Sequence, residues 1–537
     1  MTSGAAPPAD DPAIAMPPAP LSSSLSSSSS SSSMPLFRLL KTTATAAATS
    51  SSPVSALPRT AARLGSLALP GRRPVATPNF LAVASRGVVP HVTPDNATRY
   101  NVFDGAYMAL EDFIEAVPLH PNRTPPIYEA PEPPATATIP RSSRLHSYTA
   151  LAPSAVSILA PRRHPAAASH LGNGPNHISI VTSTGFQKLT VDGYRAAIDT
   201  LRPDIAVSIA DLTYGIDAAS AAAVPHPSAK RAVRMAERTE DWLNVLCRDG
   251  LADTTPTRVF APTLPVAYAM QWQYLNRLAE LVAPGDPDSS DKPKMALAGL
   301  AVYDVDLLPD LDADYATTLA PLPRLSLHPA PTPHHILRQI ALGVDVLLLP
   351  GITAASEQGL AFTFVWPPPT AVGATGGGGD GGGGGGGGGG EEMEQQPLAI
   401  DLSDPAHKTA LAPLAPGCAC GACAAHHRAY VHHLLDAHEM LAWTLLQIHN
   451  HHVVATFLSG VRATLATEQE SGADGAAATF ADLARRFAAA YEPALPAGEA
   501  TRPRVRGYQA TTNTTNGRQN KPAWGRLDDV VVGPQAP

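Results

Sequence analysis

Cysteine is scarce in this chain, with only 4 among 537 residues. Three of them stand together as Cys418, Cys420 and Cys423, and the fourth, Cys247, lies far upstream in a stretch with a helical pattern. Three clustered cysteines cannot pair off evenly, so a disulfide framework is not expected. Thiols that are sparse elsewhere and dense in one turn indicate a metal site, and a reduced cluster without metal is the alternative.

Three further absences narrow the class of protein. No run of about 20 apolar residues occurs, so no segment is expected to span a membrane, and a soluble cytoplasmic protein is predicted. No G-x-G-x-x-G opens a helical pattern, which disfavours a dinucleotide-binding sheet. The formal net charge of −8 argues against tight nonspecific binding of nucleic acid by the whole chain, while local basic patches stay open.

Biased composition marks segments that are expected to lie outside the folded core. Residues 1–33 are almost wholly Ser, Ala and Pro, which predicts a disordered extension, and a flexible tail is expected at 511–537. Residues 371–396 hold a nearly pure glycine run followed by acidic residues, which predicts a flexible insertion in a loop. Phe37 to Leu40 are predicted to form a first strand. The alternative is an organelle transit peptide, which leaves an association with the mitochondrial outer membrane open.

Apolar β runs alternate with amphipathic helical runs from residue 177 onward, which is the pattern of βα units and a parallel sheet. Strands are expected at 177–181, 205–209, 258–261, 295–302, 324–327 and 344–349, with further strand ends at 87–91 and 105–108, and helices at 191–201, 228–247, 267–282 and 333–342. The repetition predicts an α/β fold at 34–415, namely an irregular (β/α)8 barrel of the TIM type with N-terminal strands capping one mouth. A helical zinc-binding subdomain is expected at 416–510. An open doubly wound sheet is the alternative to the barrel.

The C-x-C-x-x-C cluster places three soft sulfurs within one tight turn, for which Gly417 and Gly421 supply backbone freedom. Zinc takes four ligands, and histidine is the natural fourth. The candidates are His426, His427, His432, His433, His438, His449, His451 and His452. Spacing alone does not choose among them.

The whole segment resembles the zinc subdomain of the tRNA-guanine transglycosylases, enzymes that exchange a guanine base in tRNA for queuine or its precursor. The resemblance rests on the cysteine cluster, on Arg428-Ala-Tyr430 and on Gln447-Ile-His449-Asn450, and weaker matches cover most of residues 60–510. It implies His449 as the fourth ligand, 26 residues after the last cysteine (449 − 423 = 26). Between Leu434 and His449 apolar residues recur at i, i+3, i+4 and i+7. One continuous helical face is therefore expected to carry His449 to the cysteines.

The family's catalytic positions are filled by residues that cannot do the chemistry. Base exchange needs a carboxylate nucleophile to hold the ribose while one base leaves and another enters. In the family pattern G-x-D-x-F-D, the second aspartate is the nucleophile, and here Leu348 stands in its place. The other catalytic aspartate opens the family run D-S-G-G-F-Q, and here Thr182 replaces it. Tyr303 also stands where the family has a glycine that contacts the purine.

Other carboxylates are weaker candidates for an active site. Asp345 is a candidate for a relocated nucleophile, although the family has an aspartate there as well, which favours a structural role. Asp204, Asp211 and Asp304 follow or precede strand patterns, where carboxylates also serve as caps or loop groups.

The resemblance therefore implies a non-catalytic member of the family. Such a subunit forms a heterodimer with a catalytic subunit and helps to hold tRNA. The resemblance also implies one structural Zn²⁺, whose four ligands are Cys418, Cys420, Cys423 and His449. An active homodimeric transglycosylase and a zinc-stabilised protein that binds queuine or tRNA without enzymatic duty are the alternatives. Candidate phosphate contacts are Lys230, Arg231, Arg234, Arg504 and Arg506.

Overall fold

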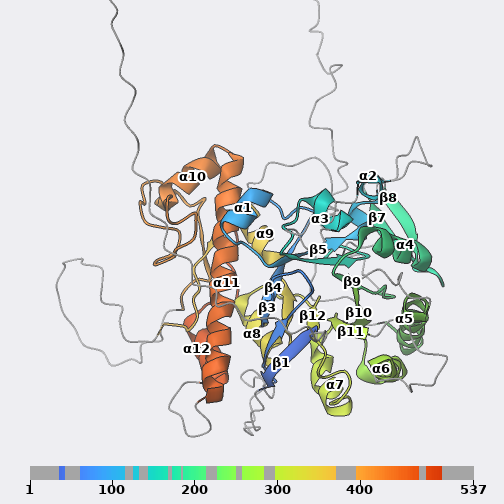
Figure 1. The fold of residues 1–537 in the computed structure, drawn as a ribbon. Coiled ribbons are helices and arrows are strands. Elements are labelled where there is room, and N and C mark those ends of the chain that lie inside the picture. The colour runs from blue at the N-terminus through green and yellow to red at the C-terminus, as the bar shows by residue number, and fades with distance from the viewer. Residues whose placement is uncertain are drawn as a thin grey trace, which may run out of the picture. The chain divides into compact units, whose positions relative to one another are not determined.

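Eight parallel strands form a closed barrel in a computed structural model of the chain (Figure 1). The structure describes residues 36–42, 61–114, 125–131, 143–166, 172–182, 185–212, 227–248, 257–282, 297–369, 395–470 and 479–498. The predicted extension at 1–33, the tail at 511–537, most of the insertion at 371–396, and Arg504 and Arg506 lie outside these residues.

The barrel strands follow one another around the ring in chain order. They are β4 (Asn79–Val83), β5 (Gly105–Ala109), β6 (Val156–Ala160), β9 (Ile205–Val207), β10 (Arg258–Thr263), β11 (Leu297–Val302), β12 (Arg324–Ser326) and β13 (Val346–Leu348). The ring closes where β13 pairs in parallel with β4, with Leu348 beside Leu81. The predicted barrel is therefore confirmed, and the open-sheet alternative is wrong.

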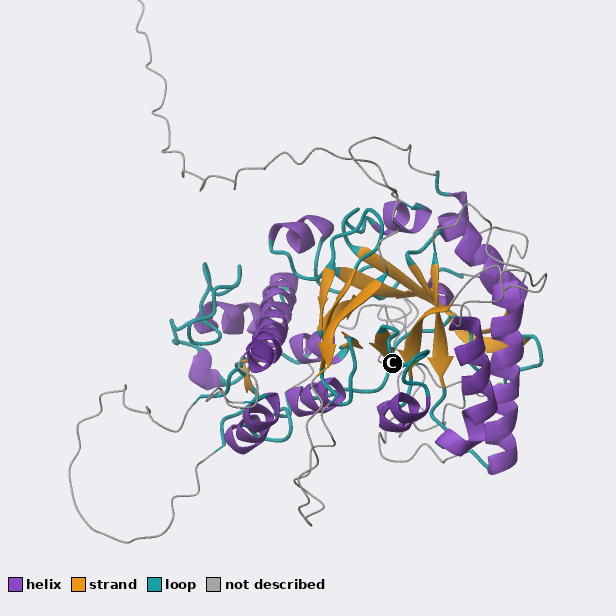
Figure 2. Cartoon of the chain, turned by 60° about the horizontal axis from the view of Figure 1, so that its bottom comes forward, coloured by secondary structure: helices purple, strands orange, loops and turns teal. Residues whose placement is uncertain are grey.

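Helices surround these strands (Figure 2). They are α1 (Pro94–Arg99), α2 (Pro126–Glu129), α3 (Arg144–Thr149), α4 (Val191–Leu201), α5 (Ala229–Arg248), α6 (Tyr268–Val282), α7 (Leu308–Asp314), α8 (Pro333–Ala341), α9 (Gly351–Glu357), α10 (Arg428–Asp436), α11 (Met440–Glu470) and α12 (Phe480–Ala490), with 3-10 turns η1 (Leu110–Asp112), η2 (Val305–Leu307) and η3 (Pro405–His407). No helix in the described part of the chain is long and apolar enough to cross a membrane.

Alternating residues of each barrel strand divide the core into two layers. Residues that point inward, such as Tyr107, Phe260 and Leu348, form an apolar cluster inside the barrel. Their neighbours point outward and pack with the helices in a second, larger cluster. Because side chains alternate between the two faces of a strand, the apolar strands here are buried on both sides.

A small antiparallel sheet stands before the barrel in the chain. It contains β1 (Phe37–Thr42), β2 (Arg63–Leu67) and β3 (Val75–Thr77) in that order, which confirms the predicted first strand. Leu67 and Val75 of this sheet belong to the cluster inside the barrel. These strands therefore cover one end of the barrel interior, as predicted.

Three local predictions were wrong. The strand expected at 177–181 is present as β7 (His177–Thr182), but it is not a barrel strand, because it pairs antiparallel with β8 (Gly185–Thr190) as a hairpin. Residues 87–91 are a turn and not a strand end, with only one isolated bridge between Ser85 and Val88. The continuous helix expected up to His449 is interrupted at His438, whose φ of 54° is left-handed.

Candidate metal centre and catalytic positions

The cysteine loop is shaped by one glycine conformation and one backbone hydrogen bond. Gly417 has a φ of 69°, a left-handed value that favours glycine, directly before Cys418. Cys423 donates its backbone N–H to the Cys420 Sγ at 3.3 Å, which closes the turn. Gly421 does not have a left-handed φ, so its predicted role in backbone freedom is wrong; a Cβ there would lie 2.2 Å from the Tyr100 ring.

Helix α11 carries His449 to this loop. Its Nδ1 lies 3.6 Å from the Cys418 Sγ, 3.5 Å from the Cys420 Sγ and 3.4 Å from the Cys423 Sγ. The four ligand atoms all lie within 4.8 Å of one another, so the cluster could hold a metal ion.

The second ring nitrogen of His449 is also bound. Nε2 lies 2.9 Å from the backbone carbonyl oxygen of Phe362 in β14 (Leu360–Phe362). A carbonyl oxygen can only accept, so Nε2 donates its hydrogen, and in the neutral ring Nδ1 then has its lone pair toward the sulfurs. This is the tautomer that a metal-binding imidazole needs, and such outer hydrogen bonds orient metal ligands.

The electrostatics of the cluster favour a cation. Burial lowers the pKa of His449, but its contacts with the sulfurs of Cys418 and Cys423 outweigh burial and raise the pKa to about 9. Hydrogen bonds among the thiols lower the pKa of Cys423 and raise that of Cys420. The group thus gathers thiolate charge beside an imidazole, and a divalent cation would replace the protons that these groups share.

Asn450 supports His449 from the next position of α11. Its Oδ1 accepts the backbone N–H of Phe362 at 2.9 Å, and its Nδ2 donates to Ser356 Oγ at 3.0 Å and to the Leu360 carbonyl oxygen at 2.9 Å. Asn450 therefore fixes β14, which in turn accepts the hydrogen bond from His449. The sequence pattern included Asn450, but it carried no sign of these three bonds.

The neighbouring histidines have other partners. His432 lies 2.8 Å from the Leu402 carbonyl oxygen, His427 accepts the backbone N–H of Tyr430 at 3.1 Å, and His451 lies 2.9 Å from the Gln447 carbonyl oxygen. His433 and His438 are exposed. None of these joins the group of four.

Leu348 and Thr182, the two positions where the resemblance predicted the loss of catalytic aspartates, lie at the carboxyl ends of strands. Leu348 ends β13 and is only 1% exposed in the apolar interior of the barrel. Thr182 ends β7, where its hydroxyl donates to the Gly185 carbonyl oxygen at 2.9 Å and accepts from Gln187 Nε2 at 3.2 Å. Neither side chain can act as a carboxylate. Ser183 and Thr184 of the same motif lie outside the described residues.

Asp345 lies at the opposite end of β13 from Leu348. It is fully buried, 3.3 Å from Arg63 of β2, and accepts the backbone N–H of Arg324 at 2.9 Å. Active sites of such barrels lie at the carboxyl ends of the strands. Asp345 thus ties the barrel to the small sheet and is not in place to attack a substrate at the mouth.

The remaining aspartates are also engaged. Asp204 precedes β9 and binds Arg72 at 2.9 Å and both the backbone N–H and the hydroxyl of Ser157. Asp304 caps η2 by accepting the Asp306 backbone N–H at 3.0 Å.

Asp211 lies beyond the carboxyl end of β9 and is fully buried. It accepts hydrogen bonds from Arg231 at 2.7 Å, Arg238 at 3.2 Å and Asn173 at 2.7 Å. Arg231 was a candidate phosphate contact, but its guanidinium is paired with this carboxylate.

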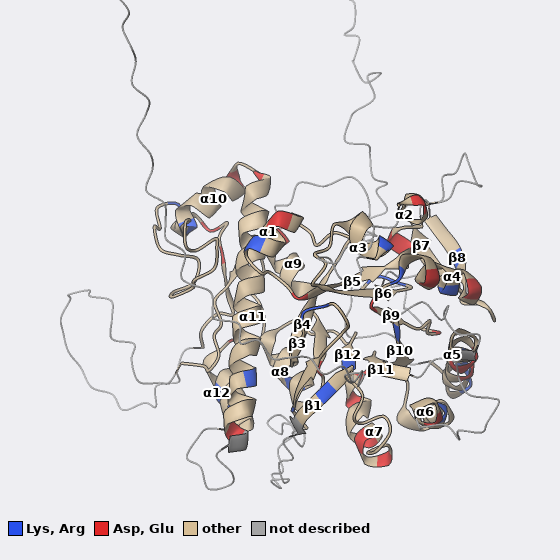
Figure 3. Cartoon of the chain, in the orientation of Figure 1, with Lys and Arg blue, Asp and Glu red and all other residues tan. Residues whose placement is uncertain are grey.

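The first half of α5 gathers four basic residues, of which Arg231 and Arg238 pair with Asp211. Lys230 and Arg234 are exposed on α5, and both α1 and α12 carry acidic as well as basic residues (Figure 3). Helix α7 is acidic, with three aspartates in seven residues. Among the candidate phosphate contacts that the structure describes, Lys230 and Arg234 of α5 are thus the exposed ones.

Comparison with known proteins identifies the family. Residues 59–473, which span the barrel and all four residues of the cysteine–histidine cluster, match the family model described as queuine tRNA-ribosyltransferase. The chain belongs to this family. A Schizosaccharomyces pombe protein named queuine tRNA-ribosyltransferase accessory subunit 2 is 30% identical over 451 residues, which cover 83% of this chain and 86% of that protein.

Two further relatives have the same name. The Drosophila virilis protein is 26% identical over 311 residues, or 56% of this chain and 65% of that protein. The Xenopus laevis protein is 41% identical over 93 residues, or 17% of this chain and 21% of that protein. The resemblance to this transglycosylase family that the cysteine spacing suggested is therefore confirmed.

Proposed function

We propose that this chain is the non-catalytic subunit of a heterodimeric queuine tRNA-ribosyltransferase, in which a catalytic partner exchanges guanine for queuine at the wobble position of the tRNA anticodon. The observation that carries the proposal is the place of Leu348. Leu348, an apolar side chain in a packed interior, stands where the family pattern implies the nucleophilic carboxylate, and this supports the proposal. The name of the relatives, accessory subunit 2, supports the same reading.

Thr182 and Asp211 add to this argument. The Thr182 hydroxyl is engaged within the β7–β8 hairpin. Asp211 is fully buried and its carboxylate is paired with Arg231 and Arg238, so its oxygens are already engaged within the protein. No acid and nucleophile pair for base exchange is thus assembled by these residues.

We assign the metal as one structural Zn²⁺ held by Cys418, Cys420, Cys423 and His449. Three thiolates and one imidazole are the donor set that zinc prefers, and four protein ligands leave no open position for an activated water. The metal would therefore stabilise the junction of α11 with the cysteine loop and take no part in the reaction.

Labelled queuine provides the test. Incorporation into tRNA is measured with this chain alone, with the catalytic homologue alone, and with the two mixed. Incorporation only in the mixture is the expected result. Turnover by this chain alone would contradict the proposal and favour an active homodimer.

The mixture needs a matched control, because an added protein can raise activity by stabilising the partner nonspecifically. Bovine serum albumin at the same concentration should give no gain. No gain from this chain either would favour a zinc-stabilised protein that binds queuine or tRNA without enzymatic duty. Residence in the cytoplasm and association with mitochondria stay predictions.

A further inference from the structure

The loop between the second and third cysteines touches helix α1, which is more than 300 residues away in the sequence. A Cβ on Gly421 would lie 2.2 Å from Cε1 and 2.4 Å from Cδ1 of the Tyr100 ring. Real Cβ atoms do not approach a ring this closely, so any larger residue at this position would have to displace the Tyr100 ring or the loop. Tyr100 is the C-cap residue of α1.

The Tyr100 ring is held on other sides as well. The Arg99 guanidinium lies over the ring at 5.4 Å from its centroid. The ring also packs against a small cluster of Val92, Val102 and Ile448, and Ile448 is the residue before the candidate ligand His449. Both the cysteine loop and α11 therefore meet the end of α1 at one place.

Helix α1 has little else to stabilise it. It has six residues, and none of them is buried. A helix of this length is marginal in water and depends on tertiary contacts for its stability. The contacts at Tyr100 and at the small cluster are thus the main anchors seen at its C-terminal end.

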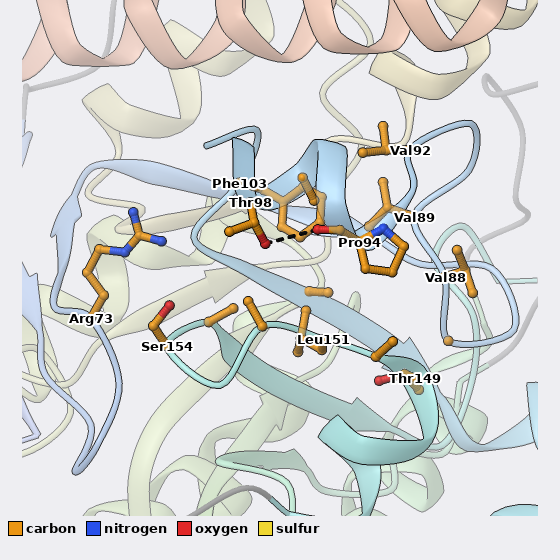
Figure 4. Close-up of a pocket in the computed structure, with 16 residues that line it drawn as sticks. Arg73, Val88, Val89, Val92, Pro94, Thr98, Phe103, Thr149, Leu151 and Ser154 are labelled. Atoms are coloured by element: carbon orange, nitrogen blue, oxygen red, sulfur yellow. Dashed lines mark hydrogen bonds between the residues drawn. The ribbon is translucent and has the colours of Figure 1, made fainter. Parts of the chain in front are cut away.

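The same helix forms one wall of a groove. An inner cavity of about 70 Å³ is lined by apolar residues that include Val89, Val92, Phe103 and Leu151, together with Pro94 and Thr98 of α1 (Figure 4). It continues into an open groove of about 770 Å³ between α1 and residues 146–154. Since Pro94 and Thr98 of α1 line both the cavity and the groove, a shift of α1 would change the shape of both.

We propose that metal binding by the cysteine cluster fixes α1 in place through the contact between Gly421 and Tyr100, and thereby sets the shape of this groove. A bound Zn²⁺ would hold the cysteine sulfurs at about 2.3 Å and so make the short loop rigid. The position of Gly421 against the Tyr100 ring would then be fixed. Without metal, the loop loses these bonds between its sulfurs, and Gly421 no longer holds the Tyr100 ring at the end of α1 in one place. The inference rests on metal binding and is independent of the role in base exchange.

Hydrogen exchange of the full chain tests the proposal. Peptides that cover residues 94–102 are compared by mass spectrometry in the zinc-loaded protein, after chelation, and after Zn²⁺ is added back. Exchange in α1 should accelerate by about tenfold or more on chelation and recover with zinc, while α6 should not change. Unchanged exchange in α1 after verified metal loss would overturn the proposal.

A variant test covers the case in which chelation unfolds the whole protein. Gly421→Ala should accelerate exchange in α1 and the release of zinc to a chelator while zinc is still bound. Gly172→Ala is the matched control, since a Cβ there meets no atom within 4 Å. In a Tyr100→Ala background, Gly421→Ala should have no further effect, because the ring it strikes is gone. If Gly421→Ala behaves like Gly172→Ala, the coupling does not exist.

Discussion

His449 donates its Nε2 hydrogen to the carbonyl oxygen of Phe362 at 2.9 Å, and this bond turns its other nitrogen toward three cysteine sulfurs. The metal site thus depends on a strand that is neither in the barrel nor in the cysteine loop. Asn450 holds that same strand with two hydrogen bonds and donates a third to Ser356 of α9.

Asn450→Ala is therefore expected to destabilise the protein by about 3 kcal/mol, because it leaves several buried polar groups without partners. Chemical denaturation measures the free energy of unfolding. Asn244→Ala is the matched control: that side chain accepts one long bond of 3.3 Å from Arg277 and should cost about 0.5 kcal/mol or less. Equal effects of the two variants would contradict the role given to Asn450.

Cys420→Ala should abolish the retention of zinc. Three ligands bind zinc far more weakly than four, and an affinity loss of about 100-fold or more is expected. Metal content per chain after dialysis, measured by mass spectrometry, reports the result. Cys247→Ala removes the fourth thiol, which is buried elsewhere, and should leave one zinc per chain.

Leu348→Asp should not create an active enzyme. The new carboxylate would lie in the apolar interior of the barrel, where an uncompensated charge or an unpaired acid costs several kcal/mol, about 3 or more. Unfolding free energy and queuine incorporation by the isolated chain are measured together. Leu348→Met is the volume-matched control and should cost about 1 kcal/mol. Turnover by Leu348→Asp alone would mean that the rest of the active site is intact.

Asp345→Asn should lower stability without removing a catalytic group. Neutralising one member of a buried ion pair leaves Arg63 without its counter-charge, which costs about 3–5 kcal/mol. The exposed pair of Arg277 and Glu280 provides the control, and Glu280→Gln should cost about 0.5 kcal/mol. Activity of the mixed subunits, expressed per folded complex, should be the same for both variants. A selective loss with Asp345→Asn would instead indicate a relocated nucleophile.

His146 should contribute to acid sensitivity. Burial and, after it, the nearby Arg72 lower the pKa of His146 from its ordinary value of 6.5. Below that value the unfolded chain takes up a proton that the folded protein resists, so the contribution of His146 to stability is present at neutral pH and is lost as the pH falls below 6.5. His146→Gln should reduce the slope of unfolding free energy between pH 6.5 and 5 by at most about 1.4 kcal/mol per pH unit.

The exposed His433→Gln is the control for this slope and should not change it. Glutamine at position 146 can still donate to the Ala155 carbonyl oxygen, which lies 3.0 Å from His146 Nε2. An unchanged slope in His146→Gln would mean that the folded protein protonates His146 as readily as the unfolded chain does.

The sequence predicted the barrel well because parallel strands that are buried on both faces leave long apolar runs, as at 344–349. It could not separate β7 from the barrel strands, since an apolar strand in a hairpin has the same local pattern as one in a barrel. The break at His438 was missed for a related reason. Apolar spacing continues across it, and a left-handed histidine has no compositional signal comparable to glycine.

The candidate metal site was predictable in its residues but not in its surroundings. Cysteine spacing and family resemblance indicated the four side chains. The contact of Gly421 with Tyr100 joins parts of the chain that no local pattern relates, and so do the bonds of Asn450 to β14. Such contacts between distant residues become visible only in the folded chain.

The seam between β4 and β13 has a consequence for how the chain folds. Val346 pairs with Asn79, which lies 267 positions earlier (346 − 79 = 267). During synthesis, the edge of β4 that pairs with β13 therefore has no partner strand until nearly two-thirds of the chain has left the ribosome. Closing the barrel over so long a loop is slow, and strand edges without a partner promote aggregation. We therefore expect this protein to depend on chaperones more than a helical protein of the same length does.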